Sequence, residues 1–227
     1  MSAVAEPPLA AEDVLAVELL TRVEGSEQLH ALLWSPGPGW RMASSAVLGG
    51  GIGERFWVLN AQVSHGYRRS DPDRHLAVLA DSVGARGPGV GLMTAADVSR
   101  HARAHDGGVD AVVTAGVDVR GWAASPVEGT VAPMAPGTIN IVAALPVALS
   151  DAAIVNAVAT ATEAKVQALL DAGLDCSGTP TDAICIAART LVPEAGEVHA
   201  FAGPRSVWGA RLARAVHRAV CGAIRLS

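Results

Sequence analysis

The chain has 227 residues, half of them apolar and 17% charged, so it can bury a large core and is not a disordered protein. Its formal net charge of -5, with scattered basic residues, argues against nucleic-acid binding. No apolar run reaches the roughly 18 residues that span a bilayer, and no basic leader precedes one, so we expect neither a membrane protein nor a secretory signal. The three cysteines form no Cys-x-x-Cys pair, which fits reduced thiols in a cytoplasmic protein.

The first part of the chain predicts a tail followed by strands. Residues 1–12 are rich in Ala, Pro and Glu and are expected to be a disordered tail, with one domain over residues 13–227. Apolar segments at 14–20 and 29–34, separated by a Glu-Gly-Ser-Glu sequence, predict a β-hairpin. A Pro-Gly-Pro-Gly turn and a glycine-rich segment then precede a strand predicted over 55–63.

Helices and strands alternate in the rest of the chain. Asp71 and Pro72 predict the start of a helix that ends near residue 85. Ser150 or Asp151 begins a long helix that Gly173 ends, and a last helix runs from about residue 206 to residue 221, with Gly222 as its cap. Further strands are predicted over 90–94, 109–117, 138–145 and 183–188. We therefore predict an α/β fold: a single domain with a mixed β-sheet packed with helices, whose strand order the sequence does not determine.

Two faces of the long helix differ in character. At about 100° per residue, one apolar face is expected to meet the core. Its members are Val155, Val158, Thr162, Val166 and Leu169. A second stripe carries two amides, one hydroxyl and one carboxylate, and consists of Asn156, Thr160, Glu163 and Gln167. A solvated face usually carries Lys and Glu in i,i+4 pairs, so this stripe either lines a wet pocket or is an ordinary exposed flank.

The turn before the strand predicted over 183–188 carries groups suited to acid–base chemistry. Thr179 and Thr181 supply hydroxyls, and Asp182 supplies a carboxylate. The carboxylate can act as a general base, orient a base, or only hold the turn by hydrogen bonds. On the long helix, Glu163 and Lys165 are two residues apart and point about 160° from each other, so only one of them can face a site.

Other strand ends carry further polar residues. Thr138 and Asn140 alternate to the same side of a strand, where the amide can polarise a substrate carbonyl, although both also suit the wet face of an edge strand. Ser44 and Ser45 precede a glycine cluster whose backbone N–H groups can approach an anion or simply form a turn. His65 follows the strand predicted over 55–63, and strand ends open onto clefts.

The histidines and cysteines do not predict a metal site. His101 and His105 are four residues apart and could share a helix face, yet flanking arginines favour a solvated basic face. The cysteines are expected to be small buried side chains. We expect neither a metal nor a cofactor.

Nine short segments stand in one order over residues 40–222. They are Arg41 with SSA at 44–46, GG at 49–50, LNAQV at 59–63, GLMTAA at 91–96, VTAG at 113–116, GTIN at 137–140, ATEAK at 161–165, GTPTD at 178–182 and AGP at 202–204. The ordered set resembles the adenosylcobinamide amidohydrolase family of cobamide salvage. The resemblance implies hydrolysis of the amide that joins aminopropanol to a propionyl side chain of the corrin ring. The implied products are adenosylcobyric acid and 1-amino-2-propanol.

The expected site lies on these segments, together with His65, which follows the strand predicted over 55–63. Catalytic roles are expected for Asp182, Glu163, Thr179, Thr181 and Lys165. Substrate contacts are expected from Arg41, Ser44, Ser45, Asn60, His65, Thr94, Thr114, Thr138 and Asn140. The nucleophile stays open between water assisted by Glu163 or Asp182 and a Thr or Ser hydroxyl, for which Lys165 would be the base. The expected partner is the corrinoid substrate, adenosylcobinamide.

Two other functions are open. A corrinoid-binding protein without catalysis would keep the pocket glycines but lose the charged residues, whereas Glu163, Lys165 and Asp182 are all present. An amidase for a smaller amide would need only an ordinary ligand site of roughly 300–1,000 Å³, and a corrinoid needs a wider opening. The family usually continues Leu-x-Asn after Thr-Ala-Gly, but Val119 stands at the Asn position, so the preferred corrinoid is undetermined.

Overall fold

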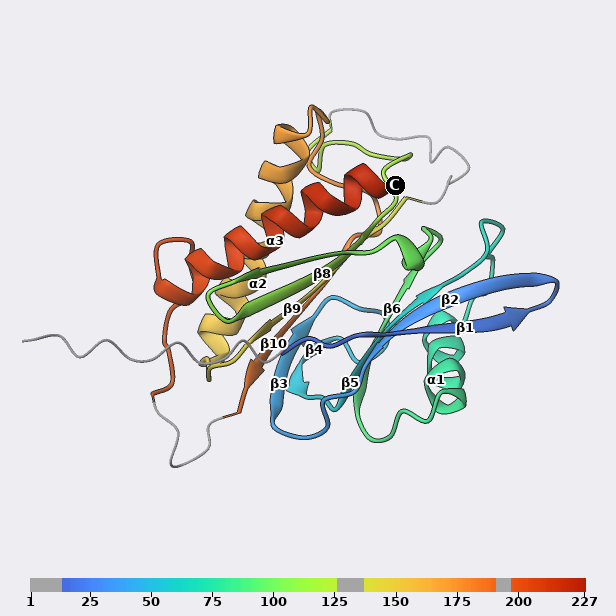
Figure 1. The fold of residues 1–227 in the computed structure, drawn as a ribbon, viewed down its shortest axis with the longest axis horizontal. Helices are drawn as coiled ribbons and strands as arrows, with labels where there is room; N and C mark the ends of the chain where they lie inside the picture. The colour runs from blue at the N-terminus through green and yellow to red at the C-terminus, as the bar shows by residue number, and fades with distance from the viewer. Residues whose placement is uncertain (1–13, 126–136, 191–196) are drawn as a thin grey trace, which may run out of the picture.

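The structure is a computed structural model that describes residues 14–125, 137–190 and 197–227, and the tail predicted over residues 1–12 lies outside them. Within these ranges the chain forms two mixed β-sheets and three α-helices (Figure 1). The predicted α/β class, with mixed strands packed against helices, is confirmed, and the strands are divided between two sheets rather than gathered in one.

The smaller sheet has four strands, with α1 packed on its outer face. Its order is β1 (Glu18–Glu24), β2 (Glu27–Trp34), β5 (Trp57–Gln62) and β6 (Gly89–Thr94). β5 and β6 are parallel, and the other pairs are antiparallel. Apolar side chains of β2 and β5, mainly Leu33, Trp57 and Leu59, pack against Leu76 on the buried face of α1 (Pro72–Ser82).

The larger sheet has six strands. Its order is β4 (Gly51–Glu54), β3 (Trp40–Ser44), β10 (Ala183–Arg189), β9 (Ile139–Leu145), β8 (Val109–Ala115) and β7 (Ala102–Asp106). β9 and β10 are parallel, and their neighbours are antiparallel to them. A short 3-10 helix, Val98–Arg100, precedes β7.

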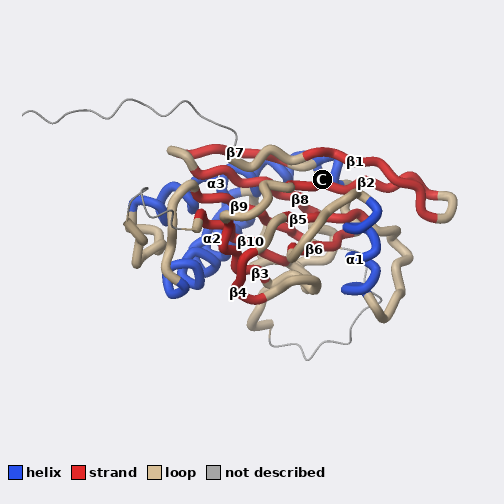
Figure 2. Tube along the Cα trace, turned by 90° about the horizontal axis from the view of Figure 1, so that it is seen from below, coloured by secondary structure: helices blue, strands red, loops and turns tan. Residues whose placement is uncertain are grey.

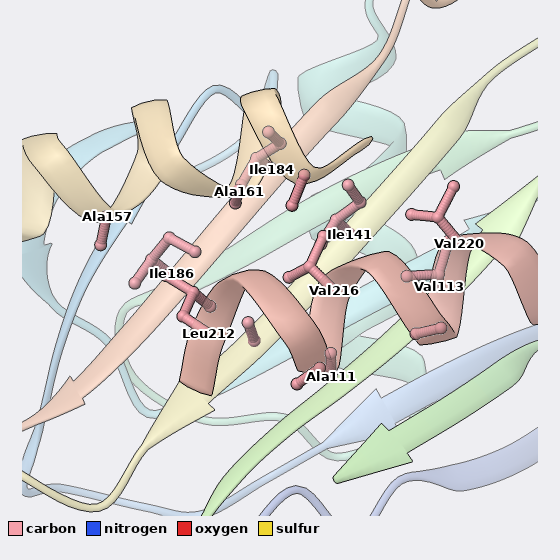
Figure 3. Close-up of a cluster of buried hydrophobic side chains, with 14 of the residues drawn as sticks. Ala111, Val113, Ile141, Ala157, Ala161, Ile184, Ile186, Leu212, Val216 and Val220 are labelled. Atoms are coloured by element: carbon pink, nitrogen blue, oxygen red, sulfur yellow. The ribbon is translucent and has the colours of Figure 1, made fainter. Parts of the chain in front are cut away.

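The two sheets pack face to face between outer helices, which gives four layers. Figures 1 and 2 show α2 (Asp151–Asp171) and α3 (Val207–Leu226) on one side of the strands and α1 on the other. Between the sheets lies a core that includes Trp34, Trp40, Met42, Leu92 and Cys185. Figure 3 shows side chains of α2 and α3 meeting β8, β9 and β10 in the second large core, among them Leu212, Val216, Ile141 and Ile186.

Local signals for helix ends are confirmed. The side chain of Ser150 accepts a hydrogen bond from the backbone N–H of Ala153 and caps α2. Pro72 occupies the first turn of α1, where its missing N–H is not needed. Gly173, with a positive φ of 78°, follows the last turn of α2.

One predicted helix end is wrong, and one possible helix pairing is absent. The last helix does not end at Gly222 but continues to Leu226. Gly222 lies inside this helix and does not cap it. A Cβ at this position would meet Ala102 Cβ at 2.9 Å, so the glycine permits close packing of the helix on β7. His101 and His105 do not share a helix face: His101 precedes β7, and His105 lies within that strand.

The predicted core face of the long helix is wrong in part: Leu169 is buried and Val158 packs half-buried against the core, but other members face solvent. Val155 is 57% exposed, and Thr162 is exposed as well. The buried face of α2 consists mainly of alanines, namely Ala153, Ala157, Ala161, Ala164 and Ala168, with Ile154 and Leu169. Small side chains let α2 approach the sheet and α3 closely, and valine periodicity alone did not reveal this.

Strand predictions hold for the most apolar segments only. The predicted hairpin exists, but its first strand is Glu18–Glu24 rather than residues 14–20. β3, β4 and β7 were not predicted. β4 is glycine-rich and mostly exposed, and β7 alternates half-buried with exposed residues, so neither has the apolar run that indicates a strand.

Candidate active site

A cavity of about 1060 Å³ lies where strand ends of both sheets meet. β3, β5 and β6 end there, while β9 and β10 begin there. Six of the predicted site residues line it: Ser45, His65, Thr94, Thr138, Thr181 and Asp182. The sequence-based expectation that polar strand ends converge is therefore met for these six.

Asp182 is held by hydrogen bonds to both carboxylate oxygens. Its Oδ1 accepts from the backbone N–H of Ile139 at 2.9 Å and from Thr179 Oγ1 at 2.5 Å. Its Oδ2 accepts from the Lys165 ammonium at 2.5 Å and from the backbone N–H of Thr179 at 3.1 Å. Four donors fill the roughly four acceptor positions of a carboxylate, so Asp182 joins the 178–182 turn, β9 and α2.

Thr138 and Thr181 form a hydroxyl pair on the cavity wall. Their Oγ1 atoms are 2.6 Å apart, and Thr181 donates to the carbonyl oxygen of Gly137 at 3.1 Å. Because the Thr181 proton is used there, Thr138 donates to Thr181. Among the described residues no other group is bonded to Thr138 Oγ1, so its lone pairs are available to accept a hydrogen bond from a ligand.

Ser45 and Thr94 are placed to donate. Ser45 Oγ accepts from the backbone N–H of Ile184 at 3.1 Å, and Thr94 Oγ1 accepts from the backbone N–H of Ala96 at 3.0 Å. The described residues offer neither O–H an acceptor, and both side chains line the cavity. Ser44, by contrast, is buried and donates to the carbonyl oxygen of Ile184 at 2.9 Å, so it fixes the strand end.

Three predicted contact residues form a buried network between the sheets. Asn60 Nδ2 donates to Thr114 Oγ1 at 2.9 Å, and Asn140 Nδ2 donates to Asn60 Oδ1 at 2.8 Å. Asn140 Nδ2 also donates to the carbonyl oxygen of Met93, which is itself a cavity residue. None of the three amide or hydroxyl side chains lines the cavity, so they support its floor from behind.

The structure places the other predicted residues elsewhere. Arg41 forms a two-point ion pair with Asp151 at the start of α2, at 2.6 and 2.8 Å, and this pair lowers the pKa of the Asp151 carboxyl. Glu163 is exposed on α2 and does not line the cavity, so the expectation that it shares a cleft with Asp182 is not met. Lys165 rather than Glu163 contacts Asp182, because the side chains of these two α2 residues point in different directions.

Sequence reasoning missed most of the loop between β5 and α1. Besides His65, this loop supplies Ser64, Tyr67, Arg68 and Arg69 to the cavity. The signal was a short polar segment between a buried strand and a proline-started helix, carrying the chain's one tyrosine. Burial raises the pKa of the Tyr67 phenol above its ordinary value.

The described residues contain no grouped metal ligands, a neutral core cysteine, and no helix suited to a membrane. Across residues 14–125, 137–190 and 197–227, no three His, Cys, Asp or Glu side chains are grouped as metal ligands, and metal independence stays a prediction. Burial raises the pKa of the Cys185 thiol to about 12, so this cysteine is a neutral core side chain. Among the described helices, none is both long and apolar enough to cross a membrane.

Comparison with known proteins gives concordant matches. The family model for adenosylcobinamide amidohydrolase matches residues 16–227. The adenosylcobinamide amidohydrolase of Methanosarcina mazei is 28% identical over 193 residues, which are 81% of this chain and 90% of that protein. A solved structure, that of the PH0078 protein from Pyrococcus horikoshii, aligns over 92% of this chain and 83% of its own, with 11% identity and a TM-score of 0.46.

The family match spans both sheets, all three described helices and every segment that lines the cavity. Its extent rules out a likeness confined to one motif. The chain therefore belongs to the adenosylcobinamide amidohydrolase family and is a hydrolase.

Proposed function

We propose that this enzyme hydrolyses the amide between aminopropanol and a propionyl side chain of adenosylcobinamide, releasing adenosylcobyric acid and 1-amino-2-propanol in cobamide salvage. The family membership supports the reaction class. The observation that carries the proposal is the pattern of donors and acceptors in the cavity, because it matches the two ends of a secondary amide.

Both ends of the amide find partners in this pattern. With respect to the residues that the structure describes, Ser45 and Thr94 each have an O–H free to donate toward a carbonyl oxygen, and Thr138 has lone pairs free to accept from an amide N–H. Donors fixed in a partly closed site stabilise the negative charge that develops on the carbonyl oxygen. These three side chains are our proposed contacts to the reacting bond.

We assign Asp182, Lys165 and Thr179 to positioning. Asp182 binds the backbone N–H of Ile139, which follows Thr138, and it precedes β10 directly after Thr181. It therefore sets the spacing of the hydroxyl pair. Its acceptor positions are filled, so we propose water as the nucleophile and assign proton removal to another group.

The size of the cavity favours a large substrate. About 1060 Å³ lies slightly above the roughly 300–1,000 Å³ of ordinary ligand sites. An amidase for a small peptide-like amide would not need this volume.

We place the enzyme in the cytoplasm, because Cys176, Cys185 and Cys221 are all free thiols.

The test is incubation of the purified enzyme with adenosylcobinamide, followed by mass spectrometry. We expect adenosylcobyric acid and 1-amino-2-propanol to appear in equal amounts. Tight binding of the corrinoid without either product would instead support the non-catalytic binding protein. Turnover of simple N-alkyl propionamides, with adenosylcobinamide left intact, would support the amidase for another amide.

A further inference from the structure

Tyr67 links the cavity to a buried histidine. It lies in the loop between β5 and α1, lines the cavity, and its hydroxyl is 3.1 Å from Nδ1 of His75. The two rings are stacked, with centroids 5.6 Å apart and planes 9° apart. His75 is 5% exposed on α1 and has no direct contact with the cavity.

The second nitrogen of His75 faces a carboxylate. Its Nε2 is 3.6 Å from Oε1 of Glu24, at the end of β1, and Arg22 pairs with the same carboxylate. A carboxylate only accepts hydrogen bonds, so Glu24 favours the tautomer with the proton on Nε2. Nδ1 is then unprotonated, and Tyr67 donates its O–H to Nδ1 while its oxygen lone pairs stay available to the cavity.

We propose that Tyr67 transfers the proton of the attacking water to His75, with Glu24 stabilising the resulting imidazolium. This inference rests on the proposed amide hydrolysis and deepens it. Tyr67 is the catalytic residue that touches the reacting water, and His75 and Glu24 are positioning residues that act through Tyr67.

The step balances without a further reactant. As the water oxygen bonds to the amide carbon, one water proton moves to Tyr67 Oη and the Tyr67 proton moves to His75 Nδ1. The carbonyl π electrons move to the oxygen, which Ser45 and Thr94 hydrogen-bond. An oxyanion electron pair then re-forms the C=O bond as the C–N bond breaks with its electron pair on nitrogen, and the proton returns from His75 through Tyr67 to the leaving amine. Tyr67 never becomes a free phenolate.

The surroundings suit a neutral relay at rest. Burial, the main cause, lowers the pKa of His75 below 6.5, so its Nδ1 is unprotonated near neutral pH. The charged groups around the ring are Glu24, which favours protonation, and Arg22 and Arg69, which oppose it, with Asp71 as a weaker favourable partner. Burial also raises the pKa of Tyr67 above 10.0, which keeps the phenol protonated. Asp182, another candidate base in the cavity, has no acceptor position free.

Two variants separate proton transfer from packing. Tyr67→Phe keeps the stacked ring without the hydroxyl, and His75→Gln keeps an acceptor for Tyr67 but cannot take a proton. Because proton transfer by a placed side chain supplies about 10²–10⁴ in rate, we expect kcat on adenosylcobinamide to fall by that factor in both, with KM unchanged. His217→Gln is the matched control, since His217 also pairs with a carboxylate, Asp171, but lies on α3 outside the cavity.

The outcomes are distinct. If the wild type is active and both variants fold and are as active as the wild type, the relay is overturned. The proposed function is then left intact. A wild type that leaves adenosylcobinamide unchanged overturns the proposed function, and the relay with it. In the wild type, kcat/KM should fall as the pH drops through the pKa of His75, and this acid limb should be absent in His75→Gln.

A spectroscopic readout covers the case in which a variant does not fold. Tyr67 is the one tyrosine of the chain, so protein labelled with ¹³Cζ-tyrosine gives a single phenol resonance. In the wild type, protonation of His75 below pH 6.5 turns Nδ1 from acceptor to donor, and the Tyr67 resonance should shift with it. A resonance that stays constant through this range, while the enzyme loses activity, would contradict the relay.

Discussion

The Lys165 ammonium lies 2.5 Å from Asp182 Oδ2, and the two side chains are only 8% and 10% exposed. This contact ties the centre of α2 to the turn that begins β10. An ion pair this buried is costly to break from one side, because the remaining charge is left without its partner in a poorly solvated place.

Removal of either partner should therefore destabilise the fold. Asp182→Asn and Lys165→Met are each expected to lower the free energy of unfolding by about 3–5 kcal/mol. The double variant should lose clearly less than the sum of the two, because it leaves no unpaired charge. Urea unfolding of the four proteins checks this, and additive losses would show that the pair is not coupled.

The same four proteins test whether Asp182 is a base. If it only positions the hydroxyl pair, the folded fraction of Asp182→Asn keeps much of its kcat. A fall of about 10²–10⁴ in kcat per folded molecule, with stability unchanged, would instead identify Asp182 as the general base. Thermal midpoint and kcat measured on one preparation separate the two roles.

Because Gly178 has no side chain, there is space for this ion pair beside it. A Cβ at Gly178 would lie 2.3 Å from Asp182 Oδ2 and 2.6 Å from Lys165 Nζ, and its φ is 154°. Gly178→Ala should therefore push the pair apart and reduce both the thermal midpoint and activity. Gly121→Ala is the matched control, because Gly121 pairs with Gly178 through the backbone but has open space at its Cβ. Equal effects of the two substitutions would contradict this explanation.

Parts of this arrangement could be predicted because their causes are local. Ser150 and Pro72 begin helices through their own hydrogen-bonding properties, and the strongly apolar strands β5, β8 and β9 follow from composition. The ordered resemblance also brought Thr138, Thr181 and Asp182 into one expected site, and all three line the cavity.

The rest depends on packing that the sequence does not display. Alanines form the buried face of α2, and alanine gives little contrast between faces in a hydropathy pattern. The Asn140–Asn60 contact joins residues 80 positions apart across two sheets whose number and order were not predictable. Tyr67 and His75 meet only because the chain reverses between β5 and α1.

Thr94 should act mainly on the transition state. Its O–H is free among the described residues and lies in the cavity, where a carbonyl oxygen would become negatively charged. Because one such donor typically contributes about 10²–10³ in rate, Thr94→Val should lower kcat by that factor. Thr94→Ser keeps the hydroxyl and should retain most of the activity. A Val variant as active as the Ser variant would remove Thr94 from the contacts to the reacting bond.

The amide network between the sheets should contribute to stability rather than to chemistry. Asn60→Leu would leave Thr114 Oγ1 without its donor and Asn140 Nδ2 with only the carbonyl oxygen of Met93. Unsatisfied buried groups of this kind cost about 1–3 kcal/mol each, so the unfolding free energy should fall by at least that amount. KM and kcat of the folded variant should stay near those of the wild type, since Asn60 does not line the cavity. A large rise in KM at unchanged stability would place Asn60 in contact with the substrate instead.

His75 should make the stability of the fold dependent on pH. Burial holds its folded pKa below the 6.5 of an unperturbed histidine, so the unfolded chain binds more protons than the folded chain in this range. The contribution of the neutral ring is fully present above pH 6.5 and is lost as the pH falls through the folded pKa. Urea unfolding of the wild type should therefore show a free energy that declines over this window.

His75→Gln cannot titrate, so its unfolding free energy should change less over the same pH range, whatever its absolute stability. His217→Gln again serves as the control, because it removes a histidine of α3 that is paired with Asp171 and leaves His75 in place. Its pH dependence below 6.5 should keep the decline due to His75. If the wild type and His75→Gln lose stability in parallel as the pH falls, burial of a neutral His75 makes no contribution to acid sensitivity.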